Sequence, residues 1–376
     1  MSAGMIPIAE PDLKGNEERY LLECLRSGWI SSQGKFVTNF EKGFAEYIGT
    51  KHAAALSSGT AALHLALAAV GVGAGDEVIL PTLTMLACAN VVHYLGATPV
   101  LADSEEETWN LDPDDLERKI TPRTKAIMVV HLYGHPAKMD RIMEVAERHH
   151  LPVVEDCAES HGAKVHTRMT GSIGTIGAFS LYSNKIITTG EGGMVTTNDA
   201  TLDQKMKWMR NQCYDPPKRK LLIHNGIGYN YRMTSLQAAV GLAQLERSEE
   251  LVAHHRKVAQ EYDRLLAPVP GITRPPELPW ARNVYWMYTP RIDAAKFGMT
   301  RDAVVESLGK QQIDSRSSFR PIHLQPPYPS LGGPGSFPVA ERLGEEGINL
   351  PSGNVTTLDH VHRVVNALVE MRKSLA

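Results

Sequence analysis

The chain has 376 residues, a length that favours two domains or one large and one small domain. Its 39 basic and 42 acidic residues give a net charge of −3, which produces no strong field for nucleic acid or for an anionic membrane. There is no run of 18 apolar residues and no signal-peptide pattern, and the four cysteines are scattered. We therefore expect a cytoplasmic globular enzyme without a metal site, a disulfide framework, a nucleic-acid partner or a membrane span.

Helical and strand patterns alternate through residues 1–240 and predict a large α/β domain. Strands at this spacing, joined by helices, pair in parallel, whereas later apolar runs without a helix between them indicate an antiparallel part of the sheet. The predicted elements are helix 59–70, strand 77–80, helix 85–95, strand 98–103, strand 126–131, helix 139–150, strand 152–156, and strands 178–182 and 193–197.

The last third of the chain has a different pattern. A long charged helix predicted at 245–266 leads into a proline-rich stretch, which we interpret as the entry to a smaller α+β domain. The predicted domains are therefore 1–245, with an N-terminal arm, and 246–376. The smaller domain is expected to contain helices at 301–308 and 358–373 and a long loop at 326–338.

Three segments place polar residues at the expected carboxyl ends of strands, where open α/β sheets bind ligands. The run 57–60, Ser-Ser-Gly-Thr, opens a helix and suits either an anion cradle or an ordinary serine cap. Asp156 ends an apolar run, either as the partner of a buried cation or as a helix cap. Lys185 precedes a Gly-rich turn, either as a desolvated amine able to form a Schiff base or as a surface lysine.

The combination is more specific than its parts. An anion cradle, a strand-end carboxylate and a reactive amine, in this order, suit pyridoxal 5′-phosphate (PLP). This cofactor requires an anion site for its phosphate, an amine for its aldehyde, and a carboxylate that keeps its ring nitrogen protonated. A nucleotide P-loop is excluded because the G-x-x-x-x-G-K-[ST] order is absent around Lys185.

Eight motifs spread over essentially the whole chain resemble the DegT/DnrJ/EryC1/StrS family of PLP-dependent sugar aminotransferases. They are segments 27–34, 58–63, 75–82, 131–134, 155–162, 179–193, 228–233 and 347–351. The resemblance implies the type I aminotransferase fold, with a mixed, mostly parallel sheet in the large domain. It also implies a homodimer whose active sites lie at the subunit interface.

The same resemblance assigns cofactor roles. Lys185 is the expected Schiff-base lysine, and Asp156 is the expected partner of the pyridine nitrogen. Met85 stands where the family usually stacks an aromatic residue on the ring, and a thioether orients the ring less strongly. The other expected cofactor contacts are Gly59, Thr60 and Ser180 at the phosphate, Glu159 near the ring hydroxyl, and Asn230 reaching the phosphate from the neighbouring subunit.

The resemblance further implies glutamate as the amino donor, pyridoxamine 5′-phosphate as the intermediate form of the cofactor, and a nucleotide-linked 4-keto-6-deoxy sugar as the acceptor. Segments 27–34 and 184–193 look closest to the branch that makes GDP-perosamine. Ser317 and Ser318 depart from that branch, which tends to have Pro-Phe there. A cyclitol or another secondary-metabolite ketone therefore stays open as the acceptor. A PLP sugar dehydratase is a further alternative, against which Lys185 and the dispersed cysteines argue.

Candidate substrate contacts come from aromatic and basic residues in the segments that resemble the family's substrate loops. A planar arginine suits a phosphate, although each of these side chains is equally consistent with packing or with a solvated surface. The candidates are Trp29, Lys218, Arg219, Tyr229, Arg316, Arg320 and His323.

Overall fold

A computed structural model of the protein describes residues 4–215 and 223–373. Its centre is a seven-stranded sheet with the strand order β1-β9-β8-β5-β4-β2-β3. Strand β9 is antiparallel to both its neighbours, and the other neighbouring pairs are parallel, which confirms the predicted mixed sheet. The strands are β1 (His52–Leu56), β2 (Glu77–Pro81), β3 (Thr98–Ala102), β4 (Thr124–Val130), β5 (Val153–Asp156), β8 (Ile176–Ser180) and β9 (Gly193–Thr197).

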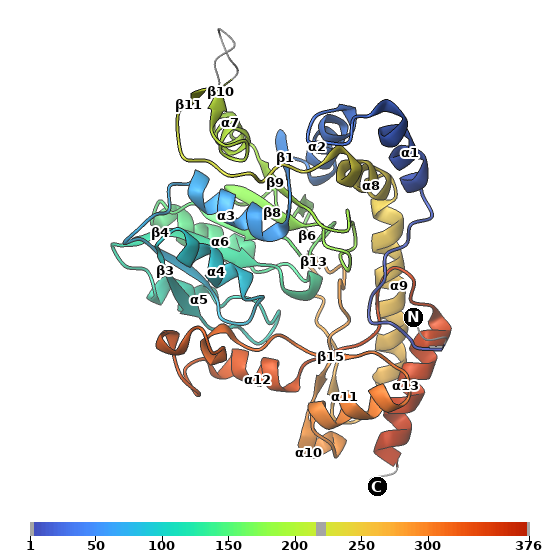
Figure 1. Ribbon diagram of the computed structural model, residues 1–376. Helices are drawn as coiled ribbons and strands as arrows, with labels where there is room; N and C mark the ends of the chain where they lie inside the picture. The colour runs from blue at the N-terminus through green and yellow to red at the C-terminus, as the bar shows by residue number, and fades with distance from the viewer. Residues whose placement is uncertain (1–3, 216–222, 374–376) are drawn as a thin grey trace.

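Helices cover both faces of this sheet (Figure 1). Helix α3 (Gly59–Ala69) is apolar on nearly all sides and is buried against β8 and β9, as expected for a helix without a polar face. Helix α6 (Met139–Arg148) is amphipathic and buries Met139, Ile142 and Val145 on one face. The other helices of this part are α4 (Ala87–Tyr94), α5 (Pro113–Arg118) and α7 (Ala200–Met209).

The predicted helix at 245–266 was wrong in its start. A capping box at Thr234 begins α8 (Ser235–Leu245), and the chain turns before α9 (Ser248–Leu266) begins as a separate helix. Two N-terminal helices that we did not predict, α1 (Glu17–Ser27) and α2 (Lys35–Ile48), pack on α8.

The C-terminal part has an apolar cluster of its own, centred on α9, α11 (Arg301–Lys310) and α13 (Leu358–Lys373), at the lower end of the molecule in Figure 1. Segment 320–343 instead packs on the large sheet, since Ile322 and Leu343 belong to the apolar core around that sheet and not to the C-terminal cluster. The predicted loop at 326–338 holds one 3₁₀ turn, and the division of the chain at residue 245 stays a prediction. The remaining helical elements are α10 (Ala294–Phe297), α12 (Pro338–Glu346), and the 3₁₀ turns Leu132–Gly134, Ile322–Leu324 and Pro329–Leu331.

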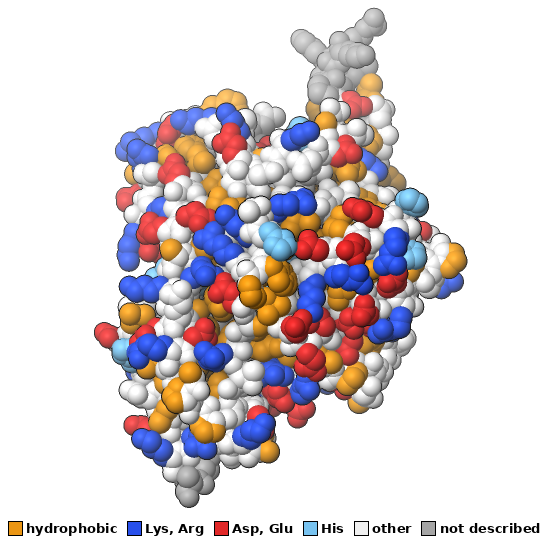
Figure 2. Space-filling view, turned by 180° about the vertical axis from the view of Figure 1, so that it is seen from behind, with side chains coloured by type: hydrophobic (Ala, Val, Ile, Leu, Met, Phe, Trp, Pro, Cys, Tyr) orange, Lys and Arg blue, Asp and Glu red, His pale blue; other side chains and the backbone are white. Residues whose placement is uncertain are grey.

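The remaining strands form small antiparallel sheets outside the central one. They are β6 (Lys164–Val165), β7 (Arg168–Met169), β10 (Tyr214–Asp215), β11 (Ile223–His224), β12 (Ile272–Thr273), β13 (Ala281–Arg282), β14 (Arg291–Ile292), β15 (Arg316–Ser317) and β16 (Ile348–Asn349). Among the helices of the described residues, none is both long and apolar enough to cross a membrane. Acidic and basic side chains are interspersed over the face seen in Figure 2.

Candidate active site

The carboxyl ends of β1, β5 and β8 meet at one edge of the sheet, and a cavity of about 460 Å³ opens there. This is where an open α/β sheet is expected to bind its ligand. The cavity brings together, over 257 positions of sequence, eight of the predicted site residues: Gly59, Thr60, Met85, Asp156, Glu159, Ser180, Lys185 and Arg316.

The start of α3 forms a tight anion cradle in this cavity. The Ser58 hydroxyl caps the helix by accepting the Ala61 N–H at 3.1 Å, whereas the N–H groups of Gly59 and Thr60 have no acceptor among the described residues. A Cβ atom added to Gly59 would lie 2.6 Å from the Cβ of Ser180, so no side chain fits between the two elements. Free amides at the positive end of a helix, in a space that admits only backbone, suit a phosphate.

Asp156 ends β5 and is almost wholly buried. One carboxylate oxygen accepts the Ala158 N–H at 3.0 Å, and the other accepts the Cys88 thiol at 3.1 Å. Burial raises the pKa of Asp156, while these two hydrogen bonds and the charge of Lys185 act in the opposite direction. A cationic partner in the cavity would stabilise this carboxylate.

Glu159 is a second buried carboxyl in the cavity, three residues further along the chain in a turn. Its Oε2 accepts the backbone N–H of Tyr133 at 2.6 Å. Burial raises the pKa of Glu159 to about 7, with the Lys185 charge opposing the rise. This group therefore changes its protonation near neutral pH, which distinguishes it from an ordinary surface glutamate.

Lys185 is carried by the loop between β8 and β9. Thr188 and Thr189 bind this loop to Leu181 through hydrogen bonds, and the Lys185 N–H closes a turn onto Tyr182 O at 2.9 Å. The Lys185 side chain is buried, which lowers the pKa of its amine, while the negative charges of Glu159 and Asp156 oppose this shift. A neutral amine is the form that acts as a nucleophile or as a base.

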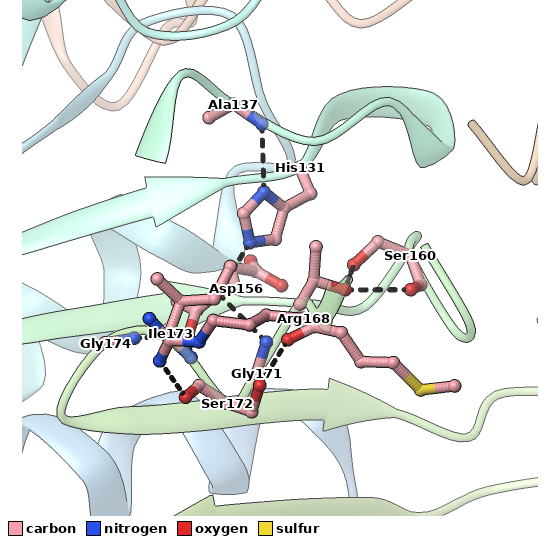
Figure 3. A network of polar contacts seen from close by, with 12 residues as sticks. His131, Ala137, Asp156, Ser160, Arg168, Gly171, Ser172, Ile173 and Gly174 are labelled. Carbon is pink, nitrogen blue, oxygen red and sulfur yellow. Dashed lines mark hydrogen bonds and ion pairs between the residues drawn. The ribbon is translucent and has the colours of Figure 1, made fainter. Parts of the chain in front are cut away.

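Glu155, the residue before Asp156, belongs to a buried network of polar contacts (Figure 3). Glu155 accepts N–H groups from the 171–174 turn at 2.6 to 2.9 Å, and its Oε2 also contacts His131 Nε2 at 3.0 Å. His131 Nδ1 accepts the Ala137 N–H at 3.1 Å, which leaves Nε2 to donate to Glu155. Glu155, His131 and the 171–174 turn do not line the cavity, so the network holds β5 in position and does not contact a ligand.

Other predicted residues lie outside this cavity. Trp29 is exposed beside a separate hollow, and Tyr229 stacks on Tyr231 with ring centroids 4.9 Å apart. The Arg320 guanidinium donates to Leu324 O at 2.9 Å. Both ring nitrogens of the buried His323 have partners inside the protein, at Thr82 and Glu341. Two predictions, Lys218 and Arg219, fall outside the described residues, and Asn230 is exposed next to Asn211.

Sequence reasoning predicted Arg316, which lies in the C-terminal wall, but missed two aromatic residues of the same wall of the cavity. Trp286 and Phe319 line it from the C-terminal part of the chain, and the Lys185 Nζ lies 3.5 Å from the centroid of the Trp286 ring. The indole N–H of Trp286 donates to Asn184 O at 2.7 Å, which joins this wall to the lysine loop. Trp286 follows no periodic pattern, and only its place in the fold identifies it.

The cavity contains a desolvated amine, two buried carboxyls and an anion cradle. These groups fit a cofactor that carries an aldehyde, a basic ring nitrogen and a phosphate. On an α/β fold with this sheet order, these features define the class of PLP-dependent enzymes. The donor groups thus fit PLP on geometric grounds.

Comparison with known proteins agrees with this class. The sequence profile of the DegT/DnrJ/EryC1/StrS aminotransferase family matches residues 11–369. The chain is 50% identical over 364 residues to a GDP-perosamine synthase of Caulobacter vibrioides, covering 96% of this chain and 97% of that protein. It is 44% identical over 347 residues to a GDP-perosamine synthase of Escherichia coli O157:H7, covering 92% and 93%.

Solved structures give the same result. The crystal structure of S. venezuelae DesV in complex with a ketimine intermediate matches with a TM-score of 0.91 and 35% identity, covering 98% of this chain and 99% of that one. The chain belongs to the DegT/DnrJ/EryC1/StrS aminotransferase family, as its motifs predicted. The family is PLP-dependent, and the predicted type I fold is confirmed.

Proposed function

We propose that the protein transfers an amino group from glutamate to the keto group of a nucleotide-linked 4-keto-6-deoxy sugar, with PLP as its cofactor. The observation that carries this proposal is the meeting of Lys185, Asp156, Glu159 and the Gly59 cradle in one cavity. The GDP-perosamine synthases at 44% and 50% identity support the sugar-nucleotide acceptor.

Six residues of the cavity have a place in holding PLP. The amides of Gly59 and Thr60, with Ser180 opposite them, would hold the phosphate, and Lys185 would hold the aldehyde carbon. Asp156 would pair with the ring nitrogen and Glu159 with the ring hydroxyl. When bound, PLP supplies a carbonyl that takes up the amino group and a conjugated ring that accepts electrons.

The protein's own part in the reaction is mainly proton transfer at Lys185. Burial lowers the pKa of its amine, which favours the neutral form that takes the proton from the α-carbon of the donor and returns it at a different position. In the second half-reaction the same nitrogen moves a proton in the reverse direction. Asp156 has the opposite task of remaining ionised beside a cation, because a positive ring nitrogen offsets the cost of burying the carboxylate.

The open end of the cavity is where we place the sugar nucleotide. Arg316 lines it with a side chain that is 63% exposed, and a guanidinium can bind a diphosphate with two parallel hydrogen bonds. Of the two serines beside it, Ser318 is buried and its hydroxyl faces the carbonyls of Leu343 and Gly344. Ser318 therefore serves packing, whereas Ser317 is exposed at the rim.

We also propose that two copies of the chain form a homodimer that completes the site. Large apolar side chains are exposed in the part of the chain that includes the cavity: Trp29 by 57%, Tyr94 by 62% and Ile227 by 94%. The exposed Asn230 is available to a neighbouring subunit, where it would reach the phosphate cradle. Light scattering coupled to size exclusion should give twice the chain mass, and a strictly monomeric active enzyme would contradict this proposal.

The four cysteines are all free and buried, which fits a reducing compartment, and we propose the cytoplasm. The function itself is tested with glutamate and a panel of GDP- and TDP-linked keto sugars and cyclitol ketones, analysed by mass spectrometry. The expected product has an amino group in place of the carbonyl oxygen of a sugar nucleotide, and K185A gives none. Amination of cyclitol ketones alone, or of no ketone by the PLP-loaded protein, would contradict the proposal.

A further inference from the structure

Tyr133 lies in a strained turn directly after β4. Its backbone has φ 53° and ψ 15°, in the left-handed region that side-chain-bearing residues rarely adopt. The turn is also packed tightly against the C-terminal part of the chain, because a Cβ on Gly134 would lie 2.8 Å from the Tyr285 nitrogen. Strain of this kind persists only where surrounding contacts enforce it, and it is concentrated at functional sites.

In this turn Tyr133 forms hydrogen bonds to two different parts of the molecule. Its N–H donates to Glu159 Oε2 at 2.6 Å, inside the large domain. Its hydroxyl accepts the backbone N–H of Phe319 at 2.8 Å, from the C-terminal segment. Burial raises the pKa of Tyr133, so the phenol stays protonated and neutral.

The Tyr133 ring makes the second set of contacts. It stacks on Phe319 with centroids 5.3 Å apart and planes at 12°, and on Trp286 with centroids 6.3 Å apart and planes at 18°. Both partners line the cavity, whereas Tyr133 itself does not. Trp286 in turn lies over the amine of Lys185.

We propose that Tyr133 is a positioning residue that fixes the C-terminal wall of the cavity, Trp286 and Phe319, opposite Glu159 and Lys185. It thereby sets how the acceptor ketone is presented to the lysine amine without touching the acceptor. The inference rests on the proposed function for its kinetic part. Its structural part, the hydrogen bond and ring stacking by which Tyr133 fixes segment 316–320, does not depend on any substrate.

The variant Tyr133→Phe removes only the hydroxyl and keeps the ring and the backbone. Hydrogen exchange followed by mass spectrometry should show the peptide that contains Phe319 exchanging about 3- to 10-fold faster, since one hydrogen bond to a protected amide is lost. With substrate, KM for the sugar nucleotide should rise by a similar factor. The glutamate half-reaction and the Kd for PLP should stay within about 2-fold of wild type, because the bond to Glu159 comes from the backbone.

A tyrosine of the C-terminal segment, Tyr328, provides a matched control. The Tyr328 hydroxyl donates to Asn90 and also joins the C-terminal segment to the large domain, but Tyr328 does not line the cavity. Tyr328→Phe should leave KM and the exchange of the Phe319 peptide unchanged. Tyr133→Leu also loses the ring stacking, so it should raise both KM for the sugar nucleotide and the exchange rate of the Phe319 peptide more than Tyr133→Phe does.

Three results would overturn the inference: unchanged exchange at Phe319 in Tyr133→Phe, an equal rise in KM in Tyr328→Phe, or a loss of PLP affinity that accounts for the whole loss of turnover. Failure of the proposed function has a different signature. In that case the wild-type enzyme itself would aminate no sugar nucleotide, while the exchange experiment would still report on Tyr133.

Discussion

The two walls of the cavity differ in how they are built. The wall from residues 58–185 joins a helix start at Gly59, the end of β5 at Asp156 and the loop that carries Lys185, and its reactive groups are buried: Asp156 is 4% and Lys185 9% exposed. The C-terminal wall is made of Trp286 and Phe319, which lie outside regular elements, and of Arg316 in the short strand β15, whose side chain is 63% exposed. Buried groups have shifted pKa values and fixed distances, which determine the reaction. The exposed arginine is free to contact the part of the substrate that extends toward solvent, so we expect it to influence which substrate binds.

Lys185→Ala should have the largest effect, because it removes both the attachment point of PLP and the group that moves the proton. We expect turnover to fall by about 10⁴-fold or more, without recovery at any pH. Half-reaction rates with glutamate, followed by absorbance, measure this loss. Lys205→Ala is a control, since its amine donates to Ala69 O and the residue does not line the cavity. Turnover within tenfold of wild type would remove Lys185 from the mechanism.

Asp156→Asn keeps the size of the side chain and removes its charge. The loss of a buried negative charge beside the ring nitrogen should lower turnover by about 10² to 10³-fold. PLP should still attach to Lys185, so the absorbance of the bound cofactor separates this effect from loss of binding. Asp140→Asn, an exposed carboxylate, is the comparison. Equal rates in the two variants would show that the charge of Asp156 is not used.

Gly59→Ala tests the cradle. The added Cβ would meet Ser180 at 2.6 Å and displace the helix start from the phosphate, so the Kd for PLP should rise by about tenfold or more. Gly73→Ala is a matched control, because a Cβ at Gly73 meets no atom within 4 Å. Fluorescence titration with PLP measures both. If the two variants bind PLP equally well, the phosphate lies elsewhere.

Glu159 gives the cofactor-free protein a pH-dependent stability. Burial raises the pKa of Glu159 to about 7, so the folded state retains a proton that the unfolded state loses at its ordinary, lower pKa. As pH rises from about 4.5 to 7, protonation of this group contributes progressively less to the free energy of unfolding, a loss on the order of 3 kcal/mol, with little further change above pH 7. Glu159→Gln should lack this loss in urea titrations at pH 5 and pH 8. A wild-type-minus-variant difference that is independent of pH would contradict the assignment.

Arg316→Ala should have the smallest effect, confined to the exposed wall. We expect KM for the sugar nucleotide to rise about 3- to 10-fold, with kcat and PLP binding unchanged. Arg320→Ala is the control, since Arg320 lies outside the cavity lining and binds Leu324 O. An equal rise in both variants would indicate a general effect of positive charge.

The same contrast explains what the sequence could predict. Gly59 begins a helix, Asp156 ends a strand and Lys185 precedes a Gly-rich turn, so periodicity and turn residues locate them, and the topology of a parallel sheet brings them to one edge. Trp286 and Phe319 come from segments without periodicity, and their approach to Lys185 depends on packing between distant parts of the chain. The hydrogen bond between Cys88 and Asp156 escaped prediction for the same reason.

Helix boundaries show a related limit. The charged helix 245–266 was predicted as one element with the correct end, but its start depended on the turn at 246–247, which separates α8 from α9. His323 had the residue type for a substrate contact, yet burial gave both its nitrogens partners within the protein. Sequence alone does not show which polar groups the fold will satisfy internally.

The attachment of PLP to Lys185 tests the central claim most directly. The protein is loaded with PLP, reduced with borohydride, digested, and analysed by peptide mass spectrometry. The account predicts a pyridoxyl-phosphate adduct on the peptide that contains Lys185, and none on that peptide after prior removal of the cofactor. An adduct on a different lysine, or stoichiometric PLP binding without any reducible bond, would contradict it.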